Sequence, residues 1–285
     1  MRYGINLYLW AGDMDDALMP VLGSLKAMGY DGVEVPIFDL DVSKWKMWAG
    51  RLDDLGLGRT ANTVIAPEHN PVSADPGVRK AAYEHMQKVV DACVAVGASI
   101  LCGPHQVALG VFTGRGATDD EWKRSVEHLR KVAEYAQPSG VLLAEEVVNR
   151  FEIYHLNVID QAIRFVDEVD HPNCRIHLDT FHAHIEEKDP AAAIRRAGDR
   201  IAHVHISEND RGVPGSGSVA WDATFAALGD IGYDGWLTVE AFGNFLPNLA
   251  AATKIWRPLF DSEEQLARDA LAFLKHKTAQ PARRR

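Results

Sequence analysis

The strongest constraint on the fold is an alternation of strand-like and helix-like segments along the whole sequence. Short apolar runs are followed by segments in which apolar residues recur every three or four positions, as in a helix with one buried face. We predict strands at residues 3–10, 33–37, 57–64, 99–103, 141–146, 175–178, 201–206 and 236–240. We predict helices at residues 15–28, 42–55, 75–96, 118–139, 158–169, 190–197, 221–228 and 262–275.

Eight such alternations favour a single (β/α)₈ barrel of the TIM type, in the α/β class. No linker rich in Pro, Gly or Ser divides the chain, so we predict one domain over residues 1–280 and a frayed basic tail at 281–285. The sequence GYDG occurs at 29–32 and again at 232–235, each time before a predicted strand. An open doubly wound sheet is the alternative, but no G-x-G-x-x-G or Walker-type loop follows the first strand.

Charge and cysteine content narrow the classes of function. Lys and Arg number 30 against 40 Asp and Glu, a net charge of −10, which argues against nucleic-acid binding. The sequence has no signal peptide and no membrane-spanning apolar run, so we expect a cytoplasmic protein without a membrane partner. Its three cysteines are widely spaced, as expected for reduced, buried thiols.

Four residues able to bind a metal stand at the predicted carboxyl ends of four consecutive strands, namely Glu146, Asp179, His205 and Glu240. Their separations of 33, 26 and 35 residues resemble one strand–helix unit of a barrel, about 31 residues. Because these strand ends surround the active site of such a barrel, we expect the four side chains to face one another. Three carboxylates and one imidazole suit a divalent cation such as Mn²⁺, Co²⁺ or Mg²⁺.

Three of the four also have a purely structural interpretation. Asp179 could cap the segment that follows it, His205 could be a hydrogen-bonded core histidine, and Glu240 could be an exposed strand end. Their common spacing favours a shared ligand set over three or four separate coincidences.

Alternation along the strands decides between neighbouring candidates. His177 and His203 share strand faces with Asp179 and His205, and in each pair we expect the residue nearer the carboxyl end to be the ligand. If Glu146 faces the barrel, the adjacent Glu145 faces the helices, where a buried carboxylate would need a Lys or Arg partner.

Several motifs occur together in the second half of the chain: EVVNRFE at 146–152, LDTFH at 178–182 with IEE at 185–187, HVH at 203–205 followed by Arg211, and GYDG at 232–235 leading to Glu240. This set closely resembles the ketose 3-epimerases, the D-tagatose and D-allulose (D-psicose) 3-epimerases of the xylose isomerase-like barrels. The resemblance extends from the first strand to the last helix and is strongest between Glu146 and Glu240.

The resemblance implies a metal-dependent isomerase that inverts C3 of a free ketose through a cis-enediolate. It implies that Glu146, Asp179, His205 and Glu240 bind one divalent ion, with Mn²⁺ favoured over Co²⁺ or Mg²⁺. It further implies that Glu146 and Glu240 are the acid/base pair. Glu152, His182 and Arg211 match positions that hold O1 to O3 of the sugar. Homodimers or homotetramers are common among such barrels.

The substrate stays open between D-tagatose, D-fructose, D-allulose and a ketopentose such as ribulose. Segments near Trp10, at 65–70 and at 105–113, where the far end of the sugar would be read, match no one subfamily. Departures such as Ala183-His184 leave an aldose–ketose or hydroxypyruvate isomerase on the same barrel as the alternative. A metal-dependent endonuclease is more remote because of the negative net charge.

Overall fold

The computed structural model describes residues 1–279, and in that range eight parallel strands close into one barrel. Each strand pairs with the next one in the sequence, and β8 returns to pair with β1. The strands are β1 (Arg2–Asn6), β2 (Gly32–Pro36), β3 (Gly58–Asn62), β4 (Ile100–Gly103), β5 (Leu142–Glu146), β6 (Cys174–Asp179), β7 (Ile201–Ile206) and β8 (Trp236–Val239). The predicted barrel is therefore confirmed, whereas residue 280 and the predicted tail at 281–285 lie outside the described residues.

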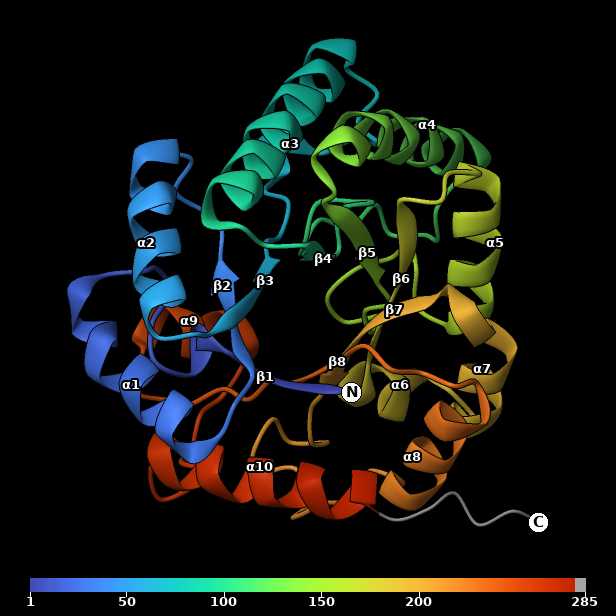
Figure 1. Ribbon diagram of the computed structural model, residues 1–285. Coiled ribbons are helices and arrows are strands. Elements are labelled where there is room, and N and C mark those ends of the chain that lie inside the picture. Colours follow the sequence, from blue (N-terminus) through green and yellow to red (C-terminus); the bar gives the residue numbers. More distant parts are fainter. Residues whose placement is uncertain (280–285) are drawn as a thin grey trace.

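The described chain has ten α-helices, most of which surround the strands on the outside of the barrel (Figure 1). They are α1 (Met19–Met28), α2 (Val42–Asp54), α3 (Pro76–Val96), α4 (Asp119–Ala136), α5 (Ile159–Val169), α6 (Thr180–Glu186), α7 (Pro190–Ala197), α8 (Trp221–Asp230), α9 (Pro247–Thr253) and α10 (Glu263–Ala279). None of the helices within residues 1–279 is both long and apolar enough to cross a membrane.

Local signals in the sequence set several helix ends. Thr118 and Glu121 form a capping box at the start of α4, in which each side chain accepts a hydrogen bond from the backbone N–H of the other residue. Gly97 ends α3 with a left-handed φ of 75°, a conformation that costs glycine little.

Two predicted elements near the N-terminus are wrong in their extent. The strand predicted over 3–10 ends at Asn6, whose side chain accepts a hydrogen bond from the backbone N–H of Tyr8 at 2.8 Å and starts a 3₁₀ turn. The helix predicted over 15–28 is divided into a 3₁₀ turn and α1, with Pro20 in the first turn of α1. Proline is suited to that position because its missing N–H has no partner in the first turn.

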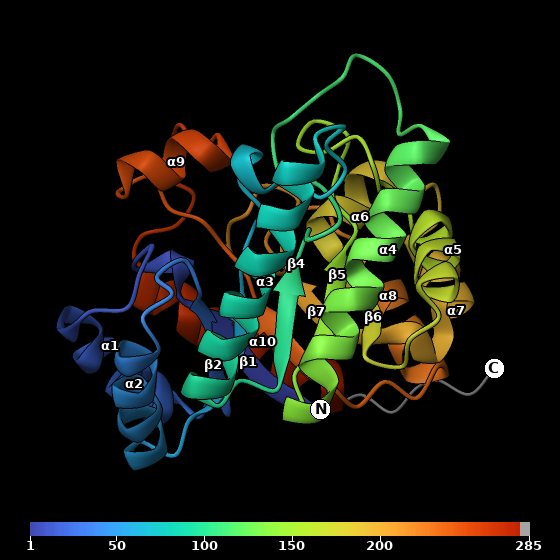
Figure 2. The same ribbon diagram turned by 90° about the horizontal axis from the view of Figure 1, so that it is seen from above.

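Two helices that the sequence did not predict lie at the functional end of the barrel. α6 follows β6 directly, and α9 lies at the end toward which the arrowhead of β4 points (Figure 2). This end carries the carboxyl ends of all eight parallel strands of the described chain, and we refer to it as the mouth.

Candidate metal centre and active site

The four residues predicted as metal ligands meet at the mouth. Glu146 and Asp179 are the last residues of β5 and β6, His205 lies one residue before the end of β7, and Glu240 directly follows β8. Each residue offers a ligand atom, and these atoms all lie within 4.8 Å of one another. All four side chains are buried, so their charges interact strongly. We refer to these four residues as the mouth cluster.

Asp179 uses its two carboxylate oxygens for different purposes. Oδ1 accepts hydrogen bonds from the backbone N–H groups of Phe181 and His182 at 2.6 and 3.3 Å and so caps α6. Oδ2 faces the mouth cluster, where it accepts hydrogen bonds from Ser207 at 3.0 Å and Arg211 at 2.8 Å. Asp179 therefore caps α6 with one oxygen and contributes to the mouth cluster with the other.

His205 is oriented by a carboxylate beneath it. Its Nε2 lies 2.7 Å from Oε1 of Glu34 on β2. Its Nδ1 faces the mouth, 3.4 Å from Glu240 and 3.6 Å from Asp179. Histidines that bind metals usually donate their second ring N–H to such a carboxylate, which sets the tautomer.

Glu34 is the residue of this site that the sequence analysis missed. It is fully buried and also accepts hydrogen bonds from Asn6 at 2.9 Å and Thr60 at 2.8 Å. The signal was a carboxylate between Val33 and Val35 in an otherwise apolar strand, because an unpaired charge there would be costly.

The mouth cluster fits a cation. Nδ1 of His205 is buried, and within residues 1–279 it has no hydrogen-bond partner although carboxylates surround it. Burial opposes a charge on His205, yet the carboxylates of Glu34 and Glu240 raise its pKa well above the ordinary range. A field that favours a proton at this nitrogen also favours a metal ion, and three carboxylates with one imidazole form a suitable donor set.

His182 from α6 contacts Glu146. The backbone N–H of Asn149 donates to Nδ1 of His182 at 3.2 Å, and Nη2 of Arg211 lies 3.2 Å from Nε2 of the same ring. Nε2 lies 3.4 Å from Oε1 of Glu146. Burial raises the pKa of Glu146 when no cation is bound beside it.

Arg211 joins the two sides of the mouth cluster. Its Nη1 donates to Asp179 at 2.8 Å and to Glu240 at 2.7 Å, and its guanidinium lies 3.9 Å from the ring centre of Phe181. Its backbone has a φ of 66°, an uncommon value for a residue with a side chain and one that often marks functional sites.

A cavity of about 370 Å³ opens above the mouth cluster, which is the size range of small-molecule sites. The predicted substrate residues Glu152, His182 and Arg211 all line it together with Glu146 and Glu240. Glu152 accepts a hydrogen bond from the side chain of Asn149 at 2.8 Å.

The outer wall of this cavity only partly follows the sequence analysis. Leu109 of the predicted segment 105–113 lines it, and so do Tyr8 and Gly12 near Trp10, whereas Trp10 itself and the segment 65–70 are not among the described lining residues. Most of the wall is apolar. Two of its apolar residues, Leu249 and Ala252, belong to α9, a helix that the sequence did not indicate. The other apolar residues of the wall, besides Leu109, are Tyr8, Phe38, Val64, Pro104, Val148, Phe181 and Phe242.

Glu145 is buried beside Glu146, but its partner is not the Lys or Arg that we predicted. Its Oε1 lies 2.9 Å from Nδ1 of His105, in the loop after β4. A neutral histidine can donate this hydrogen bond from within the protein, whereas a lysine would have to bring a second full charge out of water.

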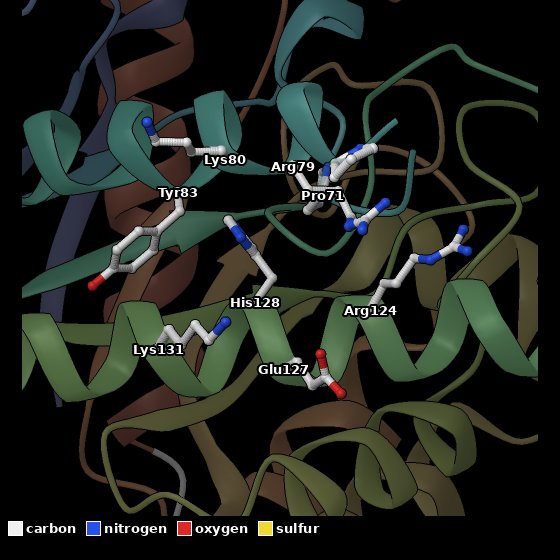
Figure 3. A pocket seen from close by; sticks show the side chains of 9 residues that line it. Pro71, Arg79, Lys80, Tyr83, Arg124, Glu127, His128 and Lys131 are labelled. Atoms are coloured by element: carbon white, nitrogen blue, oxygen red, sulfur yellow. The ribbon is translucent and has the colours of Figure 1, made fainter. Parts of the chain in front are cut away.

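A further cavity, of about 300 Å³, lies outside the barrel between α3 and α4. His128 points from α4 toward α3 and Tyr83 points from α3 toward α4 (Figure 3). Its described lining includes four Lys or Arg residues and no residue of the mouth cluster, so it is not the site of the predicted chemistry.

Comparison with known proteins identifies the family. The profile of the xylose isomerase-like TIM barrel family matches residues 22–277. The L-ribulose 3-epimerase of Methylomonas sp. (strain DH-1) is 34% identical to this chain over 97% of it and 98% of the relative. The D-psicose 3-epimerase of Enterocloster bolteae is 33% identical over 97% and 95%. The chain belongs to the ketose 3-epimerase family.

Solved structures of family members have the same fold. The D-allulose 3-epimerase of Methylomonas sp. in complex with D-allulose superposes with a TM-score of 0.91 at 34% identity, covering 97% of each chain. The relatives are isomerases that act on carbohydrates. As a ketose 3-epimerase family member, this chain is an enzyme of the same class.

Proposed function

We propose that this ketose 3-epimerase family member catalyses metal-dependent epimerisation at C3 of a free ketose. The observation that carries the proposal is the position of Glu146 and Glu240. They reach one cavity from β5 and from the end of β8, which lie on different sides of the barrel, and both belong to the mouth cluster. The names of the relatives, which include L-ribulose and D-psicose 3-epimerases, support a ketose as the substrate.

In this proposal Glu146, Asp179, His205 and Glu240 hold one divalent cation, Mn²⁺ in preference to Co²⁺ or Mg²⁺. Such an ion supplies Lewis-acid polarisation of the ketose oxygens, which acidifies the adjacent C–H bond. The orphaned Nδ1 of His205 and the three carboxylates support this assignment.

In this proposal Glu146 and Glu240 carry out the proton transfer. One of them removes the proton from C3, and the other delivers a proton to the opposite face of the same carbon, so the configuration is inverted. Both carboxylates line the cavity, so each lies beside a sugar bound there.

The remaining polar residues of the cavity orient the reacting end of the sugar. Arg211 supplies donors for sugar oxygens, Glu152 supplies an acceptor, and the ring of His182 lines the cavity beside them. Fixing O1 to O3 in this way holds C3 between the two glutamates, and such positioning accounts for a large share of many enzymatic rates. The apolar outer wall leaves D-tagatose, D-fructose, D-allulose and ketopentoses as candidates.

The reaction can be tested with a panel of these ketoses in deuterated solvent with Mn²⁺. We expect the C3 epimer as product and solvent deuterium at C3, both visible by NMR. Deuterium at C1 with an aldose product would overturn the proposal in favour of an aldose–ketose isomerase.

Replacing either glutamate tests the acid/base assignment. We expect Glu146→Gln and Glu240→Gln each to lower kcat by at least about 10²–10⁴-fold, the usual contribution of a general acid or base. Glu84→Gln, on the exposed side of α3, is the control and should keep full activity. Wild-type turnover in both mouth variants would show that the carboxylates are not the proton-transfer groups.

The quaternary structure and the compartment remain predictions from the sequence. A homodimer or homotetramer in the cytoplasm would agree with the family resemblance and the cysteine content. Sedimentation velocity distinguishes these assemblies from a monomer.

A further inference from the structure

Beneath the mouth cluster, the barrel interior holds a second group of metal-capable side chains. Cys102 on β4, His177 on β6, and His203 and His205 on β7 each offer a donor atom within 4.8 Å of the others. All four side chains are fully buried. His177 pairs in register with His203, two residues before the pair of Asp179 and His205. The group therefore lies one layer deeper in the barrel, and we call it the deep site.

We propose that the deep site binds a thiophilic divalent cation such as Zn²⁺ or Co²⁺. One thiolate and up to three imidazoles form a typical donor set for these ions, whereas Mn²⁺ and Mg²⁺ prefer carboxylates. The barrel would then contain two metal sites, one above the other: the mouth cluster, with mainly hard carboxylate ligands, and the deep site, with softer thiolate and imidazole ligands. This inference concerns metal binding and does not depend on the proposed epimerisation.

Unpaired nitrogens are the first argument for the deep site. Among the described residues, neither ring nitrogen of His177 has a hydrogen-bond partner, and neither does Nδ1 of His203. Buried polar atoms in folded proteins are nearly always paired, so three unpaired nitrogens in one place call for an unseen partner. Each neutral imidazole has one lone pair, so a cation would use one nitrogen of His177 and one of His203.

The spacing of the donor atoms is the second argument. A tetrahedral zinc site places its nitrogen and sulfur donors about 3.3–3.8 Å apart, and the donors here lie within 4.8 Å of one another. They therefore need to move inward by only about 1 Å. Within residues 1–279 no hydrogen bond holds the ring of His177, which packs against the rings of His205 and His203 at centroid distances of 4.0 and 5.1 Å.

Charge balance is the third argument. The thiol of Cys102 donates to Oε2 of Glu34 at 3.1 Å, and Nε2 of His203 lies 2.8 Å from the same oxygen. On binding, the Cys102 proton is released to solvent and the sulfur becomes the thiolate ligand. The thiolate and Glu34 together carry two negative charges, which neutralise a divalent ion in this buried space.

The shared His205 links the deep site to the mouth cluster. Its Nε2 lies 3.9 Å from Sγ of Cys102 and 2.7 Å from Glu34, while its Nδ1 faces the mouth. A cation that uses Nε2 takes that nitrogen from Glu34, and if Nδ1 already binds an ion at the mouth, His205 must release its remaining ring proton to solvent and bridge the two ions as an imidazolate. Filling the deep site therefore changes the affinity of the mouth cluster for its own ion.

Cobalt binding tests the deep site directly. Apo-protein is prepared with a chelator, and in parallel by unfolding and refolding, because a fully buried site can require opening of the barrel to fill. After loading with Co²⁺ and gel filtration, we expect two Co²⁺ per chain by elemental analysis. A thiolate-to-cobalt charge-transfer band should accompany one of them.

Variants assign the two ions. Cys102→Ser should lose the band and one equivalent, and His177→Gln should lose one equivalent. Asp179→Asn at the mouth should keep the band. Cys93→Ser is the matched control, since Cys93 is an equally buried thiol on α3 outside the deep site, and it should keep both ions and the band.

Two results would overturn the inference. A wild-type protein that binds one Co²⁺ per chain without a thiolate band has no deep site. This measurement uses the wild-type protein alone, so it does not depend on whether any variant folds. A band that persists in folded Cys102→Ser would place the thiolate ligand elsewhere. Absence of epimerase activity in a chain that holds both ions would contradict the proposed function and leave the deep site intact.

Discussion

Glu34 shows how one buried carboxylate can organise the residues around it. Its two oxygens together contact Asn6, Thr60, Cys102, His203 and His205. Burial opposes its charge, but the neighbouring histidines His205 and His203 hold the pKa of Glu34 well below its usual range. Glu34 is therefore a positioning residue, which acts on the mouth cluster through His205.

Replacing Glu34 tests this role. We expect Glu34→Gln to weaken Mn²⁺ binding by about 10–100-fold, the usual effect of losing the carboxylate behind a histidine ligand. Calorimetric titration of the apo-protein measures the affinity. Glu145→Gln is the matched control, because Glu145 is an equally buried glutamate paired with a histidine that is not a predicted ligand. Equal Mn²⁺ affinities of the two variants would refute the positioning role.

At the scale of elements, α4 and α5 pack around a histidine that carries no charge. His155 stacks on Trp122 of α4 with ring centres 5.2 Å apart, and it meets Phe165 of α5 edge to face at 5.7 Å. Burial lowers the pKa of His155 from 6.5 to about 4. Within residues 1–279 neither ring nitrogen has a hydrogen-bond partner, so protonation inside this aromatic contact is opposed.

This contact predicts acid sensitivity. Below pH 6.5 the unfolded chain binds a proton at His155 before the folded chain does, so the folded state loses stability as pH falls from 6.5 toward 4. The loss from this residue reaches about 2 kcal/mol at pH 5.

The variant His155→Phe keeps an aromatic ring in the contact and removes the titration. We expect the difference in unfolding free energy between pH 7 and pH 5, measured with urea, to shrink by about 2 kcal/mol in this variant. An unchanged difference would show that His155 is not the source of the acid sensitivity.

At the scale of the whole molecule, one indole helps to close the barrel at the end opposite the mouth. Trp236 on β8 is buried against Ile100, Cys102 and Ala144 of the opposite strands. Gly32 of the first GYDG sequence makes room for it, since a Cβ there would lie 2.6 Å from Cη2 of the Trp236 ring. The two GYDG sequences thus contribute to closure as well as to the turns before β2 and β8.

Two glycine substitutions distinguish the need for glycine in barrel closure from the effect of glycine on helix stability. Gly32→Ala should destabilise the protein by about 1–3 kcal/mol or more, because the added methyl group meets backbone and a packed ring. Gly50→Ala in α2 should stabilise it by about 0.5–1 kcal/mol, since no described heavy atom lies within 4 Å of the new methyl group. Denaturant unfolding measures both changes, and a neutral Gly32→Ala would show that the ring can move aside.

The sequence by itself determined the eight-fold alternation and, through it, the mouth cluster. Period-two and helical spacings depend only on local geometry, so strands and helices could be located. Separations close to one strand–helix unit then placed Glu146, Asp179, His205 and Glu240 at neighbouring strand ends. The short helices α6 and α9 were not predicted, because each begins with a single capping residue or proline and has too few turns to show a helical period of apolar residues.

Contacts across the barrel were decided only by the tertiary structure. Glu34 lies 171 residues from His205, and Cys102 lies 103 residues from it, and no local pattern records such pairs. Barrel closure sets how far each strand is shifted against its neighbour, and this shift decides which side chains share a layer. For that reason the sequence could name the ligands expected at the mouth, whereas the carboxylate behind His205 and the deep site became visible only in the folded barrel.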